Sequence, residues 1–464
     1  MKSDFWSQLN DKFENTQAES GPVSGSDSLV RICMIWLAGN LVVTTQLTGT
    51  LFIPGVAWHA ALGLIAVGSL FGGAVLVLVG NMGTRTGLPT MALTKGALGL
   101  RGATIPTTIN VGILMGWAWV QAMLAGVTLD HYLSPLIGFS NPILLSMSCQ
   151  VAVVCLAIFG HRGLTVVEPL FAVSILAVMY FALYGAFSDY DLHDFVNLEV
   201  DINLGWNVFS VLDVVVATAV SWTVLSAEIC RRAVSERASI VGTGLGYVLS
   251  TTLSMSFGAT ALAYVILDGR EFASFSPIPI VSAFGLPVAI IFFLSVMATN
   301  VLCIYGMVAS IVNLSRSRTL KFLPTTLIVG SLAILGCAWL PLLSAFTDFL
   351  TLIGGIFIPV FAIMVADYYF VNRGCYDRDI LLTEGGKYWF NGGYNPAGLL
   401  IWLFGAIFSH IMSYHVQSPI GSFLPTFLLV FIIYLLWASV AGRLLKSKPN
   451  SVNLSRLVSK PHDS

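Results

Sequence analysis

Long apolar runs recur through this chain and restrict its possible folds more than any other feature. A helix needs roughly 20 apolar residues to cross the hydrocarbon core of a bilayer, and runs of that length follow one another through the sequence. Several are longer than a bilayer requires, which indicates tilted or broken helices. Twelve membrane spans are expected, at 30–54, 58–81, 104–129, 142–160, 165–187, 207–228, 239–267, 279–312, 324–343, 346–371, 395–414 and 420–442.

The composition supports the same class. Only 10% of the residues are charged and 56% are hydrophobic, whereas a soluble domain averages about 25% charged residues. The chain is therefore expected to be an all-α polytopic membrane protein. Its partner is the lipid bilayer, and neither nucleic acid nor an obligate protein partner is indicated. The seven cysteines are scattered through apolar runs and form neither a metal-binding spacing nor a disulfide framework.

The basic residues predict the orientation. If both termini lie inside the cell, every Lys and Arg except Arg270 falls on the cytoplasmic side, as the positive-inside rule requires. The outer loop between the fifth and sixth spans has no Lys or Arg, and its charged residues are Asp189, Asp191, Asp194, Glu199 and Asp201. We therefore expect a multi-pass protein of the plasma membrane (the inner membrane in a bacterium), with cytoplasmic tails at 1–28 and 446–464. The first tail is expected to be disordered and lacks the pattern of a signal peptide.

Two spans carry polar residues at mid-depth. In the first span these are the threonines, glutamine and glycine of 43–50, and in the sixth they include Thr218, Ser221 and Trp222. Irregular backbone is tolerated at this depth only where it lines a cavity or is buried in protein. The pattern favours two helices interrupted around a site, although small and hydroxylated residues also allow close helix packing.

The third span places Trp117 and Gln121 four residues apart, on one face of a helix. An indole beside an amide suits a flat polar ring, which would stack on one side and form hydrogen bonds at its edge. The alternative for Trp117 is a tryptophan of the interfacial belt.

The eighth span carries Asn300, which needs a partner at depth, either a neighbouring helix or a ligand. Ser295 and Thr299 lie four residues apart on one face, and their oxygens are of the hard type that an alkali cation prefers. Two acidic residues, Asp213 in the sixth span and Glu168 in the fifth, are candidates for coupling; the alternative for each is a charge at a helix end.

In combination these segments resemble the nucleobase:cation symporter-1 family, which includes permeases for cytosine, purines, allantoin, hydantoin and thiamine precursors. The resemblance covers about residues 30 to 440. Each landmark alone is unspecific, whereas the set is specific. The landmarks are Leu47-Thr48-Gly49-Thr50-Leu51, the loop 83–106, Gly116-Trp117, Ser221 with Ala227-Glu228 and Arg231, Ala298-Thr299-Asn300, and Val365-Ala366-Asp367-Tyr368.

The resemblance implies the leucine-transporter fold, in which two inverted five-helix repeats precede two extra helices. The repeats would occupy 29–190 and 205–372, and the last two spans 394–445. The substrate pocket would lie between spans 1, 3, 6 and 8, and would be formed by Val42 (through its backbone), Trp117, Gln121, Ser221, Trp222 and Asn300. The family's sodium site would use the carbonyls of Ala38, Leu41 and Ser295 and the hydroxyl of Thr299. Na+ would then be the coupling ion, and no other cofactor is expected.

The chain departs from the family's pattern at two positions. Ala298 stands where the family often has a second hydroxyl, which weakens the inference of sodium. Ala219 stands where an aromatic residue is usual, and Trp222 follows three residues later. Stacking would then move to Trp222, and the substrate would differ from cytosine. The Leu-Thr-Gly-Thr-Leu and Ser-Trp elements favour the hydroxymethylpyrimidine-type members.

The leading function is a secondary symporter that imports a nucleobase or related heteroaromatic compound with sodium or a proton, by alternating access. The same fold carrying an amino acid or another small zwitterion is the alternative, and it predicts a carboxylate-binding helix end in the first span. An enzyme is disfavoured because the sequence has no buried His pair, H-E-x-x-H motif or Ser/Lys dyad. A passive channel is disfavoured because no charged ring or repeated pore loop is visible.

Overall fold

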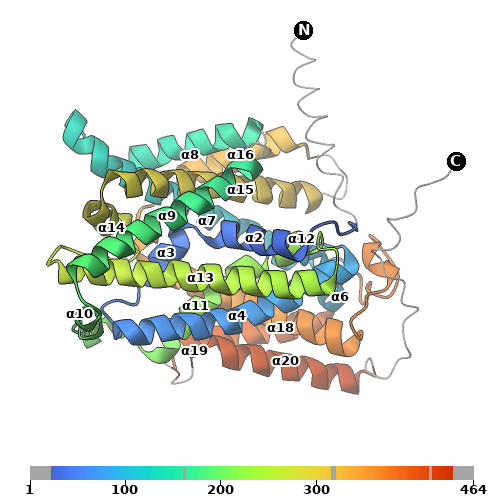
Figure 1. The fold of residues 1–464 in the computed structure, drawn as a ribbon. Helices are drawn as coiled ribbons and strands as arrows, with labels where there is room; N and C mark the ends of the chain where they lie inside the picture. Colours follow the sequence, from blue (N-terminus) through green and yellow to red (C-terminus); the bar gives the residue numbers. More distant parts are fainter. Residues whose placement is uncertain (1–21, 160–163, 315–319, 417, 419–420, 443–464) are drawn as a thin grey trace, which may run out of the picture.

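The computed structural model describes residues 22–159, 164–314, 320–416, 418 and 421–442, and shows one bundle of long helices lying alongside one another (Figure 1). Two isolated bridges are the only β-structure among these residues. In chain order the helices are α2 Leu29–Asn40, α3 Val43–Thr50, α4 Trp58–Thr86, α5 Thr90–Leu93, α6 Lys95–Leu98, α7 Thr104–Ile137, α8 Pro142–Phe159, α9 Leu164–Asp189, α10 Leu192–Val196, η3 Ile202–Leu204, α11 Val208–Thr223, α12 Ser226–Cys230, α13 Glu236–Leu267, α14 Pro277–Phe284, α15 Leu286–Leu314, α16 Phe322–Gly336, α17 Pro341–Ser344, α18 Phe346–Val365, η4 Ala366–Val371, η5 Arg378–Leu381, α19 Pro396–Tyr414 and α20 Phe423–Val440.

Each of the twelve expected spans overlaps at least one of these helices. In the part of the chain that the structure describes, seven helices are long and apolar enough to cross a membrane, or eight spans if the bent pair α2 and α3 counts as one. Within the described residues, the apolar stretches of α8, α9, α11 and α16 are shorter than these. The all-α polytopic fold is thus confirmed, while the number twelve stays a prediction.

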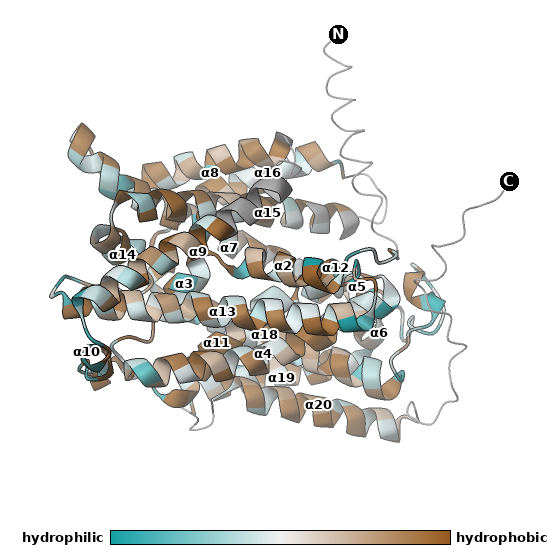
Figure 2. Ribbon diagram, viewed as in Figure 1, coloured by the Kyte–Doolittle hydropathy of each residue, from teal (hydrophilic) through white to brown (hydrophobic). Residues whose placement is uncertain are grey.

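The surface of the bundle is that of a protein surrounded by lipid. Figure 2 shows hydrophobic residues along the outer helices and hydrophilic ones gathered near α10 and near α5 and α6, at opposite ends. Large apolar side chains such as Ile328 and Leu436 are more than half exposed, and a soluble monomer rarely exposes so many. We call these two ends the α10 end and the α6 end.

The first span is broken, because α2 and α3 meet at an angle of 59°. The break falls at Leu41 and Val42, whereas the polar run 43–50 is itself helical. The expected interruption within that run is therefore wrong by a few residues. Glycine lets α3 touch α13: a Cβ on Gly49 would lie 1.9 Å from the carbonyl oxygen of Met255. Close packing, the alternative explanation of the run, thus applies to this glycine.

Asn40 fixes the junction between the two halves. Its Nδ2 donates to Ser250 Oγ (3.1 Å) and to Thr251 Oγ1, both on α13, and its Oδ1 accepts from Thr45 Oγ1 (3.1 Å) on α3. The break is therefore held by side chains far away in the sequence.

The sixth span is interrupted as well. α11 ends at Thr223, α12 begins at Ser226, and the polar residues of the span lie in the last turns of α11 rather than in the break. The two broken helices open the two expected repeats, as an inverted repeat requires. The boundaries 29–190, 205–372 and 394–445 stay predictions.

The chain enters the bundle across the α6 end. In a strap formed by residues 22–27, the N–H of Val23 donates to the carbonyl of Gly87 (3.2 Å), and those of Ser26 and Asp27 donate to the carbonyl of Arg232 (2.8 and 2.7 Å). The strap therefore joins the start of α2 to the ends of α4 and α12. The rest of the first expected tail, and the tail at 446–464, lie outside the described residues.

Candidate functional site

A small cavity lies where α3, α7, α11 and α15 meet. Its volume is about 60 Å³. It is lined by Thr44, Thr45, Thr48, Leu114, Trp117, Gln121, Thr218, Ser221, Trp222, Leu225, Thr299 and Cys303. These helices belong to spans 1, 3, 6 and 8, the four between which the pocket is expected.

The cavity is narrow in this conformation. Its volume of about 60 Å³ is far below the roughly 300–1,000 Å³ of a typical ligand pocket. The surrounding helices must part before a ring enters.

Trp117 and Gln121 both line the cavity, on one face of α7. The indole of Trp117 packs edge-on against Phe346 and Phe349, with ring centroids 5.7 and 5.6 Å apart, so it is not an interfacial tryptophan. Gln121 is only 2% exposed. Its Nε2 donates to Cys303 Sγ (3.2 Å), and its Oε1 has no hydrogen-bond partner among the described residues.

Ser221 and Trp222 line the cavity from α11. The hydroxyl of Ser221 donates to the carbonyl of Thr218 (2.7 Å). Trp222 packs edge-on against Trp36 of α2, with ring centroids 6.3 Å apart. Trp222 is thus the aromatic side chain that α11 presents to the cavity, while position 219 of the same helix is an alanine.

Asn300 and Val42 do not line the cavity. Asn300 is fully buried, and its Nδ2 donates to the carbonyl of Ala118 (3.1 Å) and to Gln150 Oε1 (2.8 Å). Through this nitrogen it joins α15 to α7 and α8, while its Oδ1 has no hydrogen-bond partner among the described residues. Val42 precedes α3, and its carbonyl accepts from the N–H of Thr45 (3.1 Å).

The residues of the expected sodium site lie on α2, at the break that follows it, and on α15. The last carbonyls of a helix have no intrahelical partner, and Ala38 and Leu41 lie at this end of α2. The hydroxyl of Thr299 donates to the carbonyl of Ser295 (2.9 Å), which leaves its lone pairs free for a cation. Such neutral oxygens fit a hard cation. No group of three or more His, Cys, Asp or Glu among the described residues could hold a metal.

Several lining residues are absent from the expected pocket: Thr44, Thr45, Thr48, Leu114, Thr218, Leu225 and Cys303. The four threonines among them do belong to the polar segments expected around a site. Helical spacing offered a signal for Thr218 and Cys303. Thr218 precedes Trp222 by four residues, and Cys303 follows Thr299 by four, so each shares a helix face with an expected site residue.

Comparison with known proteins decides the family. Residues 25–437 match the model of the family described as "Permease for cytosine/purines, uracil, thiamine, allantoin". The chain belongs to this permease family. It is therefore a membrane transporter and not an enzyme.

Individual relatives agree with this assignment. The permease is 23% identical to the cytosine permease of Escherichia coli (strain K12) over 370 residues, which cover 79% of this chain and 84% of the relative. It is 25% identical to the allantoin permease of Bacillus subtilis (strain 168) over 460 residues, with coverages of 87% and 90%.

A solved structure shares the fold. It is that of Mhp1, a nucleobase-cation-symport-1 family transporter, closed with bromovinylhydantoin bound. It matches with a TM-score of 0.75 at 16% identity, and covers 95% of this chain and 98% of its own. The expected leucine-transporter-like fold is thus confirmed.

The acidic residues of the sixth span tie helices of the permease together. Both carboxylate oxygens of Asp213 cap the start of α20: they accept from the N–H (2.7 Å) and hydroxyl (2.9 Å) of Ser422 and from the N–H of Phe423 (3.2 Å). Glu228 accepts from the N–H (3.3 Å) and hydroxyl (2.7 Å) of Thr90, which joins α12 to α5. The side chain of Glu168 lies outside the described residues.

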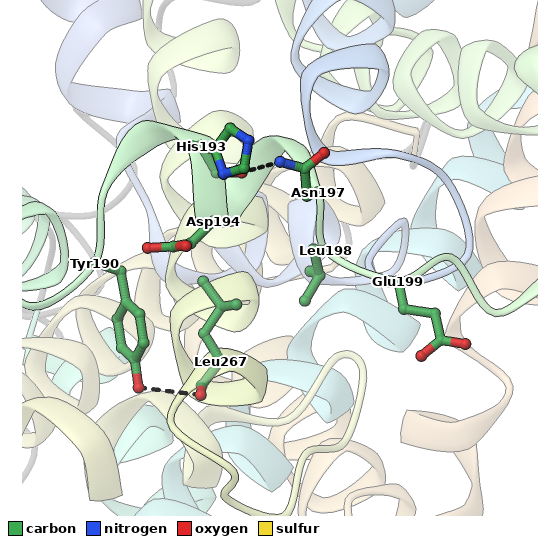
Figure 3. A pocket seen from close by; sticks show the side chains of 7 residues that line it. All are labelled: Tyr190, His193, Asp194, Asn197, Leu198, Glu199 and Leu267. Carbon is green, nitrogen blue, oxygen red and sulfur yellow. Dashed lines mark hydrogen bonds between the residues drawn. The ribbon is translucent and has the colours of Figure 1, made fainter.

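A second hollow opens on the surface at the α10 end, with a volume of about 570 Å³ (Figure 3). Its rim carries His193, Asp194 and Glu199. Desolvation, and then the nearby carboxylates of Asp268 and Asp189, raise the pKa of Tyr190. Its hydroxyl therefore stays protonated and donates to the carbonyl of Leu267 (3.0 Å). The hollow lies on the acidic loop and away from the four helices of the cavity.

Proposed function

We propose that the permease imports a nucleobase-like heteroaromatic compound by cation symport, and that the cavity is its substrate site. The observation that carries this proposal is the lining: Trp117 and Trp222 offer aromatic surfaces from two helices, and Gln121 offers a buried amide beside them. Indole surfaces and a single amide suit a flat ring with polar edges. Ser221 contributes a hydroxyl to the same space.

The lining also supports a neutral cargo. Among the described residues that border the cavity there is no Asp, Glu, His, Lys or Arg. Burying a charge without a partner is costly, so the cavity suits an uncharged ring better than a zwitterion. The same lack of acidic and basic side chains favours sodium over a proton, with Ala38, Leu41, Ser295 and Thr299 as its ligands.

Alternating access would follow from the broken helices. Half-helices in spans 1 and 6 would hold cargo and cation at mid-membrane while one part of the bundle rocks against the other. If the cation binds the outward-open state more tightly than the inward-open state, its binding favours the outward-open state. This difference in affinity couples cation binding to cargo binding. In this scheme the α6 end faces the cytoplasm, in the plasma membrane.

Uptake into proteoliposomes tests the proposal. Purified permease is reconstituted, and accumulation of radiolabelled cytosine, adenine and hydroxymethylpyrimidine is followed with an inward sodium gradient, with a proton gradient, and with neither. We expect sodium-dependent accumulation of at least one ring and no competition by amino acids. Accumulation of none of them under any gradient, or competition by amino acids alone, would refute the proposal.

A further inference from the structure

We propose that Cys303 is a positioning residue for substrate selection. It holds the Nε2 side of the Gln121 amide, so that the carbonyl oxygen of Gln121 faces the cargo. The permease then selects rings that present an N–H donor at this edge, such as an amino group. This inference rests on the proposed function, because it assumes that the cavity holds the cargo.

The contact between the two side chains is direct. Gln121 Nε2 lies 3.2 Å from Cys303 Sγ, and both residues line the cavity. The other end of the amide, Oε1, is buried and has no hydrogen-bond partner among the described residues. A buried carbonyl left in this state is costly, and a donor on the cargo would satisfy it.

The other amide of this region points elsewhere. Asn300 donates to Ala118 and Gln150, away from the cavity. Thr299 and Cys303 occupy the face of α15 that borders the cavity. Cys303 is therefore the residue of α15 that accepts the hydrogen bond from the Gln121 amide.

Four hydroxyl groups around the cavity all use their proton within their own helix. Thr48, Thr218, Ser221 and Thr299 each donate their proton to a backbone carbonyl of their own helix, at distances of 2.7 to 3.0 Å. A hydroxyl has one donor and two acceptor lone pairs, so these four oxygens retain acceptor capacity for a ligand. Acceptors on three helices favour a cargo rich in N–H groups.

The test uses pairs of rings that differ in one group. Cytosine and uracil, and adenine and hypoxanthine, exchange an amino group for an oxo group at the same position. Uptake of each ring is measured for the wild type, Cys303→Ala and Cys303→Ser, with Cys155→Ala as the control because Cys155 is exposed on α8. Serine retains an acceptor for Gln121 Nε2, whereas alanine removes it.

We expect the wild type, Cys303→Ser and the control to prefer the amino member of a pair. In Cys303→Ala the amide is free to turn, and the preference falls about tenfold, the typical value of one hydrogen bond to a ligand. The fall should come from a higher KM for the amino ring with little change in the maximal rate. A purely structural role of the thiol would instead lower uptake of both members equally.

Three outcomes would overturn the inference: equal preference in Cys303→Ala and the wild type, preference of the wild type for the oxo member, or loss of the preference in Cys303→Ser. If Cys303→Ala does not fold, Cys303→Val decides, since valine also removes the acceptor for Gln121 Nε2 but fills more of the space of the cysteine. Its preference for the amino ring should fall as in Cys303→Ala. An unchanged preference in Cys303→Val refutes the inference. Failure of the wild type to take up any ring refutes the proposed function instead.

Discussion

At the scale of the residue, two buried amides show how similar side chains serve different purposes. Each leaves its carbonyl oxygen without a hydrogen-bond partner among the described residues, but Gln121 borders the cavity, whereas the amide nitrogen of Asn300 donates to two groups on neighbouring helices. Both could be placed at mid-depth from the sequence. The direction of each could not, because a helix surrounded by protein has no apolar and polar faces that separate ligand from neighbour.

The two amides should respond differently to truncation. Asn300→Ala removes the donor to Gln150 and Ala118 and should destabilise the permease by about 1–3 kcal/mol, with KM close to that of the wild type. Gln121→Ala should raise KM about tenfold or more with little change in melting temperature. Thermal unfolding in detergent and uptake kinetics measure both quantities.

Gln150→Ala serves as the matched control, since it removes the other half of the same contact. It should reproduce the loss of stability seen for Asn300→Ala. A large increase in KM for Asn300→Ala, at unchanged stability, would mean that Asn300 contacts the cargo in another state of the transport cycle.

At the scale of the element, the polar runs in spans 1 and 6 indicated where the chain is irregular but missed the breaks by a few residues. Hydroxyls in these runs donate to carbonyls within the helix, as Thr48 does to Thr44 (2.8 Å), and are therefore compatible with helix. The break after Asn40 depends instead on Ser250, 210 residues away. Local sequence does not contain that information.

Asp213 is an element-scale feature, because it caps the start of α20 from α11. Asp213→Ala should lower stability by about 0.5–2 kcal/mol, the usual cost of losing a helix cap. The dependence of uptake on sodium and pH should be unchanged. Asp213→Asn, which keeps an acceptor oxygen, should be the milder variant.

The measurement is gradient-driven uptake beside a thermal melt of each variant. Loss of accumulation in Asp213→Asn, with a normal melting temperature and normal binding, would assign this carboxylate to coupling and contradict a capping role.

At the scale of the whole molecule, hydropathy predicted most of the fold. Every expected span falls on a helix, because the bilayer accepts few alternatives to long apolar helices. The meeting of spans 1, 3, 6 and 8 came from the family resemblance and agrees with the cavity. The size of the cavity and the part played by Cys303 depend on packing between helices, which composition and periodicity do not encode.

The strap predicts which helices move together. Because residues 22–27 are bonded to Gly87 and Arg232, the ends of α2, α4 and α12 should shift as one body. Spin labels on α2 and α4 should keep their separation when sodium and cargo are added, whereas labels on α4 and α8 should change theirs. Pulsed electron spin resonance measures both distances, and a change in the first pair larger than in the second would contradict this grouping.

The small volume of the central cavity bears on how readily ions leak through the permease. We expect a centre of only about 60 Å³ to leave little room for ions and water to cross, so the permease without cargo should leak few ions. The ion gradient should then be used chiefly when cargo binds and the helices separate.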